Sequence, residues 1–133
     1  MIHREESPTD RMRDTLGDAE VGKLLSPLIE IRSYQLLPGR SVDFDRLVAE
    51  MSVPMLRRRS VDVVAYGPSS QGEDMYYLIR AYPSLDVMRE SEEAFYGSAE
   101  WRDGPREAIL GLIDTYTSIV LEVPEAVVQG LRR

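Results

Sequence analysis

Six acidic, basic and phenolic residues recur with even spacing in two stretches of the chain, and the positions between them are mostly apolar. They are Glu30, Arg32, Tyr34, Tyr76, Arg80 and Tyr82. Arginine binds carboxylates and enolates through charged hydrogen bonds, while tyrosine donates hydrogen bonds or stacks on aromatic rings. Because buried charges persist only when they are paired, we expect Glu30 to pair with Arg32 or Arg80. The set suggests a ligand-binding cavity for an aromatic or acidic metabolite, in which no catalytic residue is identified.

The same six residues fit a second interpretation, in which they form an ion-pair network at a dimer interface and Glu30 and Arg32 satisfy each other. Such networks are common at interfaces, and tyrosine is common in strands of every kind. The spacing does not separate the two interpretations. The first gives a small-molecule-binding protein, which includes a cofactor-free enzyme of monooxygenase or isomerase type. The second gives a non-enzymatic homodimeric assembly module.

The elements that carry these residues follow from apolar periodicity and from the positions of proline and glycine. Strands are predicted over 28–36, 61–66, 75–82 and 115–122. A helix over 41–58, which Pro54 is expected to kink or to divide into two pieces, joins the first two strands. A helical region from 83 to about 113, broken near Gly97 and Gly104-Pro105, joins the last two. The order β-α-β-β-α-β predicts an α+β, ferredoxin-like fold, with a four-stranded antiparallel sheet and both helices on one face.

A sheet that is covered by helices on one face only needs a partner for its second face. Ferredoxin-like sheets commonly pair face to face with a second copy, so we expect a homodimer with a ligand cavity between the two sheets. The smaller and less polar set of strand residues is expected on the helix side; this set is Ile29, Ile31, Tyr77, Ile79 and Ala81. That assignment places the six polar and phenolic residues on the open face, toward the cavity.

Composition disfavours several classes of function. The 133 residues suffice for one domain, and 16 Lys+Arg against 23 Asp+Glu give a net charge of −7, which disfavours nucleic acid as a partner. The chain has no cysteine and a single histidine, His3, so thiolate sites, histidine-rich metal sites and interior haem ligation lack ligands. We therefore expect no metal and no cofactor. Neither a signal peptide nor a membrane-spanning apolar run is visible, which predicts a cytoplasmic protein without a membrane partner.

The remaining segments receive structural interpretations. Residues 1–27 are predicted to be an N-terminal extension that is either a short helix or disordered, 28–123 the folded domain, and 124–133 a short amphipathic tail. The acidic residues Glu90, Glu92 and Glu93 are interpreted as a solvated helix face. Trp101, the only tryptophan, is interpreted as an anchor of the second helical region.

Four segments resemble the NIPSNAP family in their order and spacing. In segment 29–39 an acidic residue, an arginine and a tyrosine precede a Pro-Gly turn, and segment 54–58 is similar to the family's proline-containing helix. Segment 78–85 resembles its third strand running into a helix, and segment 98–101 resembles a small-acidic-Trp element. The resemblance covers roughly residues 28–122. One departure is the pair Arg59-Ser60, where the family tends to have His-Gly, so the turn lacks its glycine and an imidazole is lost.

The resemblance implies a dimeric α/β-barrel built from ferredoxin-like subunits, in agreement with the predicted strand order. Relatives of this barrel include haem-degrading enzymes, cofactor-free quinone-forming monooxygenases, lactone isomerases and proteins without a known activity. The resemblance therefore implies a fold and a mode of assembly, and it supplies no reaction.

Overall fold

The computed structural model describes residues 26–133, so residues 1–25 of the predicted N-terminal extension lie outside the described residues. Four strands form one antiparallel sheet: β1 (Leu28–Leu36), β2 (Asp62–Pro68), β3 (Met75–Tyr82) and β4 (Ile113–Glu122). Their order across the sheet is β2-β3-β1-β4. The predicted bounds of β1 and β3 are confirmed, while β2 continues to Pro68 and β4 begins earlier, at Ile113. The α+β, ferredoxin-like arrangement predicted from the sequence is thereby confirmed.

The first crossover is one continuous helical segment with a change of winding before Pro54. It consists of α3 (Ser41–Leu47), the π-helical turn η1 (Val48–Ser52) and α4 (Val53–Arg58). Proline has no N–H to give to the preceding turn, and it is tolerated at the start of a helix. The wider π-helical turn accommodates the missing N–H of proline, and Pro54 lies in the first turn of α4.

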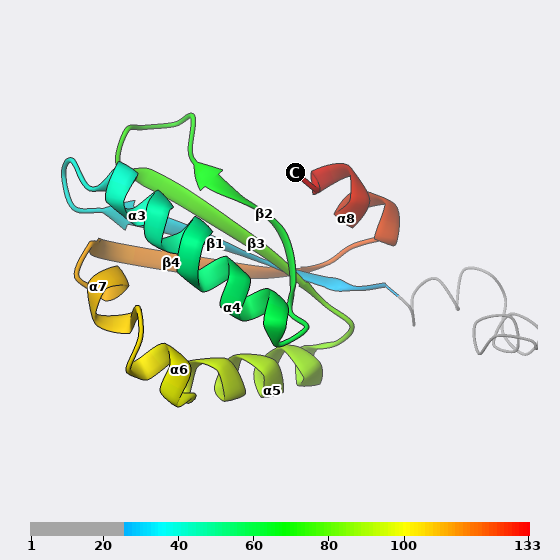
Figure 1. Ribbon diagram of the computed structural model, residues 1–133. Coiled ribbons are helices and arrows are strands. Elements are labelled where there is room, and N and C mark those ends of the chain that lie inside the picture. The colour runs from blue at the N-terminus through cyan, green and yellow to red at the C-terminus, as the bar shows by residue number, and fades with distance from the viewer. Residues whose placement is uncertain (1–25) are drawn as a thin grey trace, which may run out of the picture.

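The second crossover contains three helices, α5 (Leu85–Tyr96), α6 (Ala99–Arg102) and α7 (Arg106–Leu110). Serine side chains cap the first two: Ser84 Oγ accepts a hydrogen bond from the Val87 N–H, and Ser98 Oγ accepts one from the Trp101 N–H. Figure 1 shows these helices and α3–α4 on one side of the sheet. Within residues 26–133, no helix is long and apolar enough to cross a bilayer.

The main core lies between the sheet and the helices α3–α7. Its buried members from the sheet include Tyr34, Leu36, Tyr76 and Leu78, and Phe44 is one of its members from the helices. Phe44 packs edge-on against Tyr76, with ring centroids 4.9 Å apart. The sheet side of this core is therefore rich in large aromatic side chains.

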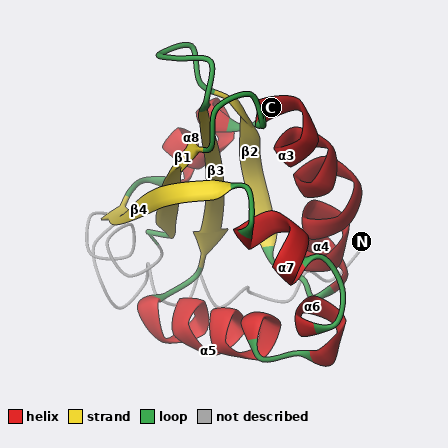
Figure 2. Cartoon of the chain, turned by 90° about the vertical axis from the view of Figure 1, so that its left-hand side faces the viewer, coloured by secondary structure: helices red, strands yellow, loops and turns green. Residues whose placement is uncertain are grey.

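The opposite face of the sheet carries a smaller core under α8 (Glu125–Leu131), the helix formed by the predicted amphipathic tail. Val128 of α8 is buried there among Ile29, Val64 and Ala65. Arg132, just after the helix, donates two hydrogen bonds to the Asp62 carboxylate, at 2.7 and 3.0 Å. Figure 2 shows α8 on the far side of the sheet from α3 and α4.

The assignment of strand residues to the two faces was wrong. The six polar and phenolic residues do share one face, but it is the face covered by α3–α7, and the smaller set faces α8 and the open surface. Long side chains fill the space between a sheet and its helices, and Arg80 is buried there with 0% exposure because its charge is paired. Small residues such as Ala81 suit the close approach of α8.

Candidate functional site

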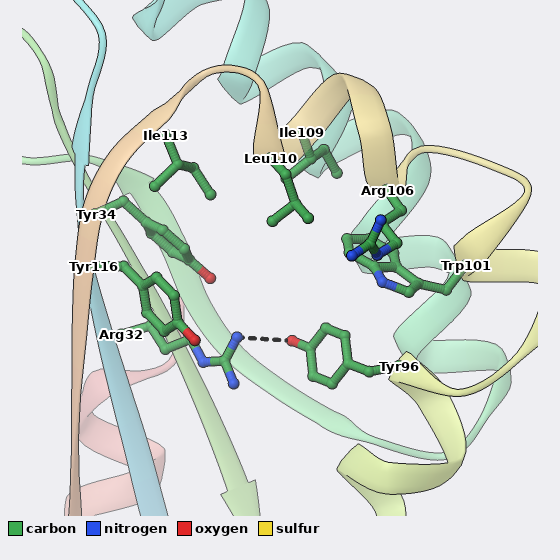
Figure 3. Close-up of a pocket in the computed structure, with 9 residues that line it drawn as sticks. All are labelled: Arg32, Tyr34, Tyr96, Trp101, Arg106, Ile109, Leu110, Ile113 and Tyr116. Atoms are coloured by element: carbon green, nitrogen blue, oxygen red, sulfur yellow. Dashed lines mark hydrogen bonds between the residues drawn. The ribbon is translucent and has the colours of Figure 1, made fainter.

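A pocket of about 350 Å³ lies between one end of the sheet and the second group of helices. It is lined by Arg32, Tyr34, Tyr96, Trp101, Arg106, Ile109, Leu110, Ile113 and Tyr116. Figure 3 shows the sheet residues on one side, the tyrosine and tryptophan of the helices opposite them, and aliphatic residues above. This volume is in the range of small-molecule sites.

The sheet wall of the pocket is built by β1 and β4. Antiparallel pairing places Tyr34 directly opposite Tyr116, so both side chains leave the same face, and their ring centroids are 6.0 Å apart. Arg32 lies two residues before Tyr34 and therefore also projects to this face. Its guanidinium carbon is 5.5 Å from the centre of the Tyr116 ring.

The helix wall is aromatic. Tyr96 is the last residue of α5, and Trp101 lies in α6 beyond the short turn at Gly97 and Ser98. The two rings meet edge to face, with centroids 5.4 Å apart and an interplanar angle of 84°. Arg106, at the start of α7, adds a half-exposed cation, paired with Glu107, to the same pocket.

A buried ion-pair network lies behind the pocket, and Arg80 is its centre. Arg80 on β3 is the direct neighbour of Glu30 on β1 in the strand register. Its Nε donates to Glu30 Oε1 at 3.1 Å, and its Nη2 contacts the same oxygen. Its Nη1 donates to the Tyr96 hydroxyl at 2.9 Å. Glu30 is also almost fully buried, so the predicted pairing of these two charges is present inside the subunit and not at an interface between subunits.

Arg32 links this network to the pocket. Its Nη1 donates to the Tyr96 hydroxyl at 2.9 Å, its Nη2 donates to Glu92 Oε1 at 3.3 Å, and its Nε lies 3.5 Å from Glu30 Oε1. Burial lowers the pKa of Arg32, but Tyr96 and Glu30 raise it, and the net change is upward. Arg32 is therefore a charged group held in a fixed position at the pocket wall.

Glu92 is part of this network, and its interpretation as a residue of a solvated face was wrong. Its side chain is 17% exposed and its Oε2 lies 3.5 Å from Arg80 Nη2. Burial raises the pKa of Glu92, and the nearby Glu30 raises it further, against the opposing effects of Arg80 and Arg32. The site thus holds two arginines, one firmly paired carboxylate and a second carboxylate that retains its proton to higher pH than usual.

The six residues predicted from the sequence take different positions around the site. Arg32 and Tyr34 line the pocket, and Glu30 and Arg80 form the network behind it. Tyr76 and Tyr82 are buried outside this pocket, and the Tyr76 hydroxyl donates to Asp45 Oδ1 at 2.6 Å. Tyr82 is buried beside the network, where burial raises the pKa of its hydroxyl and the charges of Arg80 and Glu92 act on it, so the structure brings five of the six to the site and leaves Tyr76 apart.

Sequence reasoning missed the helix half of the pocket. Tyr96 and Arg106 were not singled out, nor was Tyr116 of the sheet wall, and Trp101 was interpreted only as an anchor of the second helical region, although it both packs in the core and lines the pocket. One signal was available: Met88, Glu92 and Phe95 are spaced three and four residues apart, which places the glutamate on the buried side of α5. A glutamate at such a position needs a buried cation.

Comparison with solved structures finds the same fold in several NIPSNAP family proteins. A NIPSNAP protein of unknown function from Agrobacterium tumefaciens matches with a TM-score of 0.68 and 21% identity over 75% of this chain and 90% of that chain. A second NIPSNAP family protein from Agrobacterium tumefaciens matches with a TM-score of 0.67 and 18% identity, over 73% and 85% of the two chains.

A third solved structure comes from Bordetella bronchiseptica and is named as a candidate antibiotic biosynthesis monooxygenase. It matches with a TM-score of 0.58 and 22% identity, over 73% of this chain and 96% of that chain. At these identities, the likeness shows the fold alone. No curated protein matches the chain. The NIPSNAP family model matches residues 29–123, which span all four strands and both crossovers, and the chain belongs to the NIPSNAP family.

Proposed function

We propose that this protein binds a small anionic aromatic molecule in the pocket between the sheet and α5–α7. The observation that carries this proposal is the pairing of a partly buried, charged arginine with an aromatic lining: Arg32 lies among Tyr34, Tyr96 and Tyr116. Aromatic rings favour a planar apolar ligand body, and the cation favours a negative group on it. The volume of about 350 Å³ suits a ligand of one or two rings.

A cofactor-free enzyme of monooxygenase or isomerase type is the catalytic form of this proposal. The pocket offers phenol hydroxyls and guanidinium groups, which can stabilise an enolate or phenolate and move its proton. The name of the Bordetella bronchiseptica structure is compatible with such chemistry. The non-enzymatic assembly module remains the alternative, and it makes no use of the pocket.

Trp101 allows a direct test because it is the only tryptophan of the chain and lines the pocket. We expect 4-nitrophenol and 4-hydroxybenzoate to change its fluorescence in a saturable titration, and cyclohexanol to do so much less. Arg32→Gln should weaken binding of the anions by about tenfold or more, since each factor of ten corresponds to about 1.4 kcal/mol.

Arg58→Gln is the matched control, because Arg58 lies outside the pocket in an exposed pair with Glu100. This variant should bind as the wild type does. A flat titration with every aromatic anion, or equal affinities of the Arg32 and Arg58 variants, would refute ligand binding in this pocket.

We also propose that a second copy of the chain covers the open face of the sheet, so that the protein is a homodimer. The part of this face outside α8 is apolar and exposed: Ile119 is 55% and Leu121 is 40% exposed, and both pair with isoleucines of β1. Ile119→Asp should convert a dimer into a monomer in a concentration series by native mass spectrometry. Val42→Asp, on an exposed helix position, should not. A wild-type protein that stays monomeric throughout would contradict the proposal.

A further inference from the structure

The Tyr96 hydroxyl occupies an unusual position between two guanidinium groups. It accepts hydrogen bonds from Arg32 Nη1 and from Arg80 Nη1, both at 2.9 Å. Figure 3 shows the first of these bonds, with Tyr96 reaching across the pocket from the helix side toward Arg32. A phenol oxygen has two acceptor positions and one hydrogen. Because both acceptor positions are taken, the hydroxyl can only donate to any further partner.

The two arginines are held in place independently of Tyr96. Arg80 is fully buried and bonded to Glu30, and Arg32 is bonded to Glu92. Charge-assisted hydrogen bonds into the phenol oxygen polarise its O–H bond and make it a stronger donor. The position of the ring is fixed as well, because it packs edge-on against Trp101. Tyr96 is thus a preorganised donor at the wall of a pocket.

The same contacts restrict which anion can bind at this wall. A carboxylate is best bound by two parallel N–H groups of one guanidinium. In Arg32, Nη1 donates to Tyr96 and Nη2 donates to Glu92, so the edge formed by these two nitrogens is already engaged, and Nε, which has no hydrogen-bond partner, lies 3.5 Å from Glu30 Oε1, where a second carboxylate would be repelled. A single oxygen atom on a ring needs only one strong donor, and the Tyr96 hydroxyl provides it.

Building on the proposed function, we propose that the ligand is a phenol that binds as its phenolate, with its oxygen accepting the hydrogen bond of Tyr96. Arg32 and Arg80 stand behind the hydroxyl and stabilise the negative charge through it. The ring of the ligand lies between the aromatic walls of the pocket, with Tyr34 and Tyr116 next to it on the sheet side. The selected substrate class is therefore a phenol or the enol of an aromatic ketone.

The probe for this proposal is 4-nitrophenol, whose phenolate absorbs visible light and whose neutral form does not. In mildly acidic buffer, where most of the free probe is neutral, wild-type protein should increase the phenolate band in a saturable manner. Tyr96→Phe should abolish this increase and weaken binding by about tenfold. Tyr77→Phe removes a phenol hydroxyl on the other face of the sheet, outside this pocket, and it should keep the phenolate band.

A second probe, 4-nitroanisole, controls for the fold of the Tyr96 variant. It has the same ring but cannot ionise, so wild type and Tyr96→Phe should bind it equally when Trp101 fluorescence is followed. Retention of the phenolate band in Tyr96→Phe would overturn this inference, as would binding of benzoate without binding of 4-nitrophenol. Either result leaves ligand binding in the pocket intact. Absence of binding by all aromatic probes would instead refute the proposed function itself.

Discussion

Arg80 offers the sharpest test of the network behind the pocket. Arg80→Met keeps most of the side-chain volume and removes the charge, so the packing of the core changes little. It leaves the buried Glu30 carboxylate without its main partner and leaves the Tyr96 hydroxyl with one donor fewer. The variant therefore isolates the electrostatic contribution of this arginine.

The expected loss of stability follows from the burial of the pair. Breaking a buried ion pair by removing one partner costs about 3–5 kcal/mol, because the remaining charge stays buried and unpaired. Arg32 Nε lies 3.5 Å from the same Glu30 oxygen and compensates in part. We therefore expect a loss at the low end, about 3 kcal/mol. That is a large fraction of the total stability of an ordinary domain, about 5–15 kcal/mol.

The assay is urea unfolding at neutral pH, followed by Trp101 fluorescence and by circular dichroism. The matched control is Arg58→Met, in which an exposed pair with Glu100 is lost and about 0–1 kcal/mol is expected. The double variant Glu30→Gln/Arg80→Met should recover part of the loss, because no unpaired charge is left. If Arg80→Met costs no more than Arg58→Met, the network does not stabilise the fold as argued.

Three further predictions concern single positions. Ser60 has a φ of 63°, a backbone conformation that favours glycine, so Ser60→Gly should raise the free energy of unfolding by about 0.5–1 kcal/mol in the urea experiment. Ser98→Gly removes a helix cap and should lower the free energy of unfolding in the same experiment. Tyr76→Phe removes the hydrogen bond to Asp45 and should cost about 1 kcal/mol, while Tyr116→Phe should change the unfolding midpoint little. The raised pKa of Glu92 means that the folded state binds this proton more tightly than the unfolded state, so its contribution to stability is present below a pH of about 4.5 and is lost as the pH rises through the folded-state pKa. In Glu92→Gln, the loss of stability between acidic and neutral pH, measured by thermal melts, should therefore be smaller than in the wild type.

Each of these predictions has an outcome that contradicts it. A neutral or destabilising Ser60→Gly would mean that the turn after α4 is not strained at this residue. Equal midpoints for Tyr76→Phe and the wild type would mean that water replaces the bond to Asp45 at no cost. An unchanged pH profile in Glu92→Gln would place the titrating group elsewhere.

The fold could be predicted from this sequence because its signals are local. Alternation over 28–36 and 75–82, the Pro38-Gly39 turn and the glycine and proline breaks of the second crossover mark the elements without reference to the rest of the chain. The sequence also shows that serine replaces the family's glycine at position 60, and in the structure Ser60 adopts the positive φ that a glycine would adopt more easily. The Ser60 N–H bonds to the Arg57 carbonyl and the Val61 N–H to the Leu56 carbonyl, a helix ending that favours glycine at this position.

The site could be predicted only in part, because it depends on which face of the sheet the helices cover. Polarity suggested the wrong face: the charged set was placed on the open side, yet Arg80 is the most buried large side chain of the described part of the chain. Its burial requires Glu30, Glu92 and Tyr96 together, and two of these come from α5, the element that follows β3 in the chain. A pattern within one strand does not reveal partners on another element.

The position of β4 at the rim of the sheet affects how chains of this protein can associate when the fold is perturbed. Within residues 26–133, β4 pairs with β1 alone, and its stretch 115–121 contains no charged residue. An uncharged strand with a free row of backbone N–H and C=O groups is a template for adding further strands. The rim strand on the other side, β2, is irregular between Val63 and Ala65 and ends in Pro68, both of which discourage such addition. Growth of intermolecular sheet, in storage or on heating, is therefore directional and starts from the β4 rim.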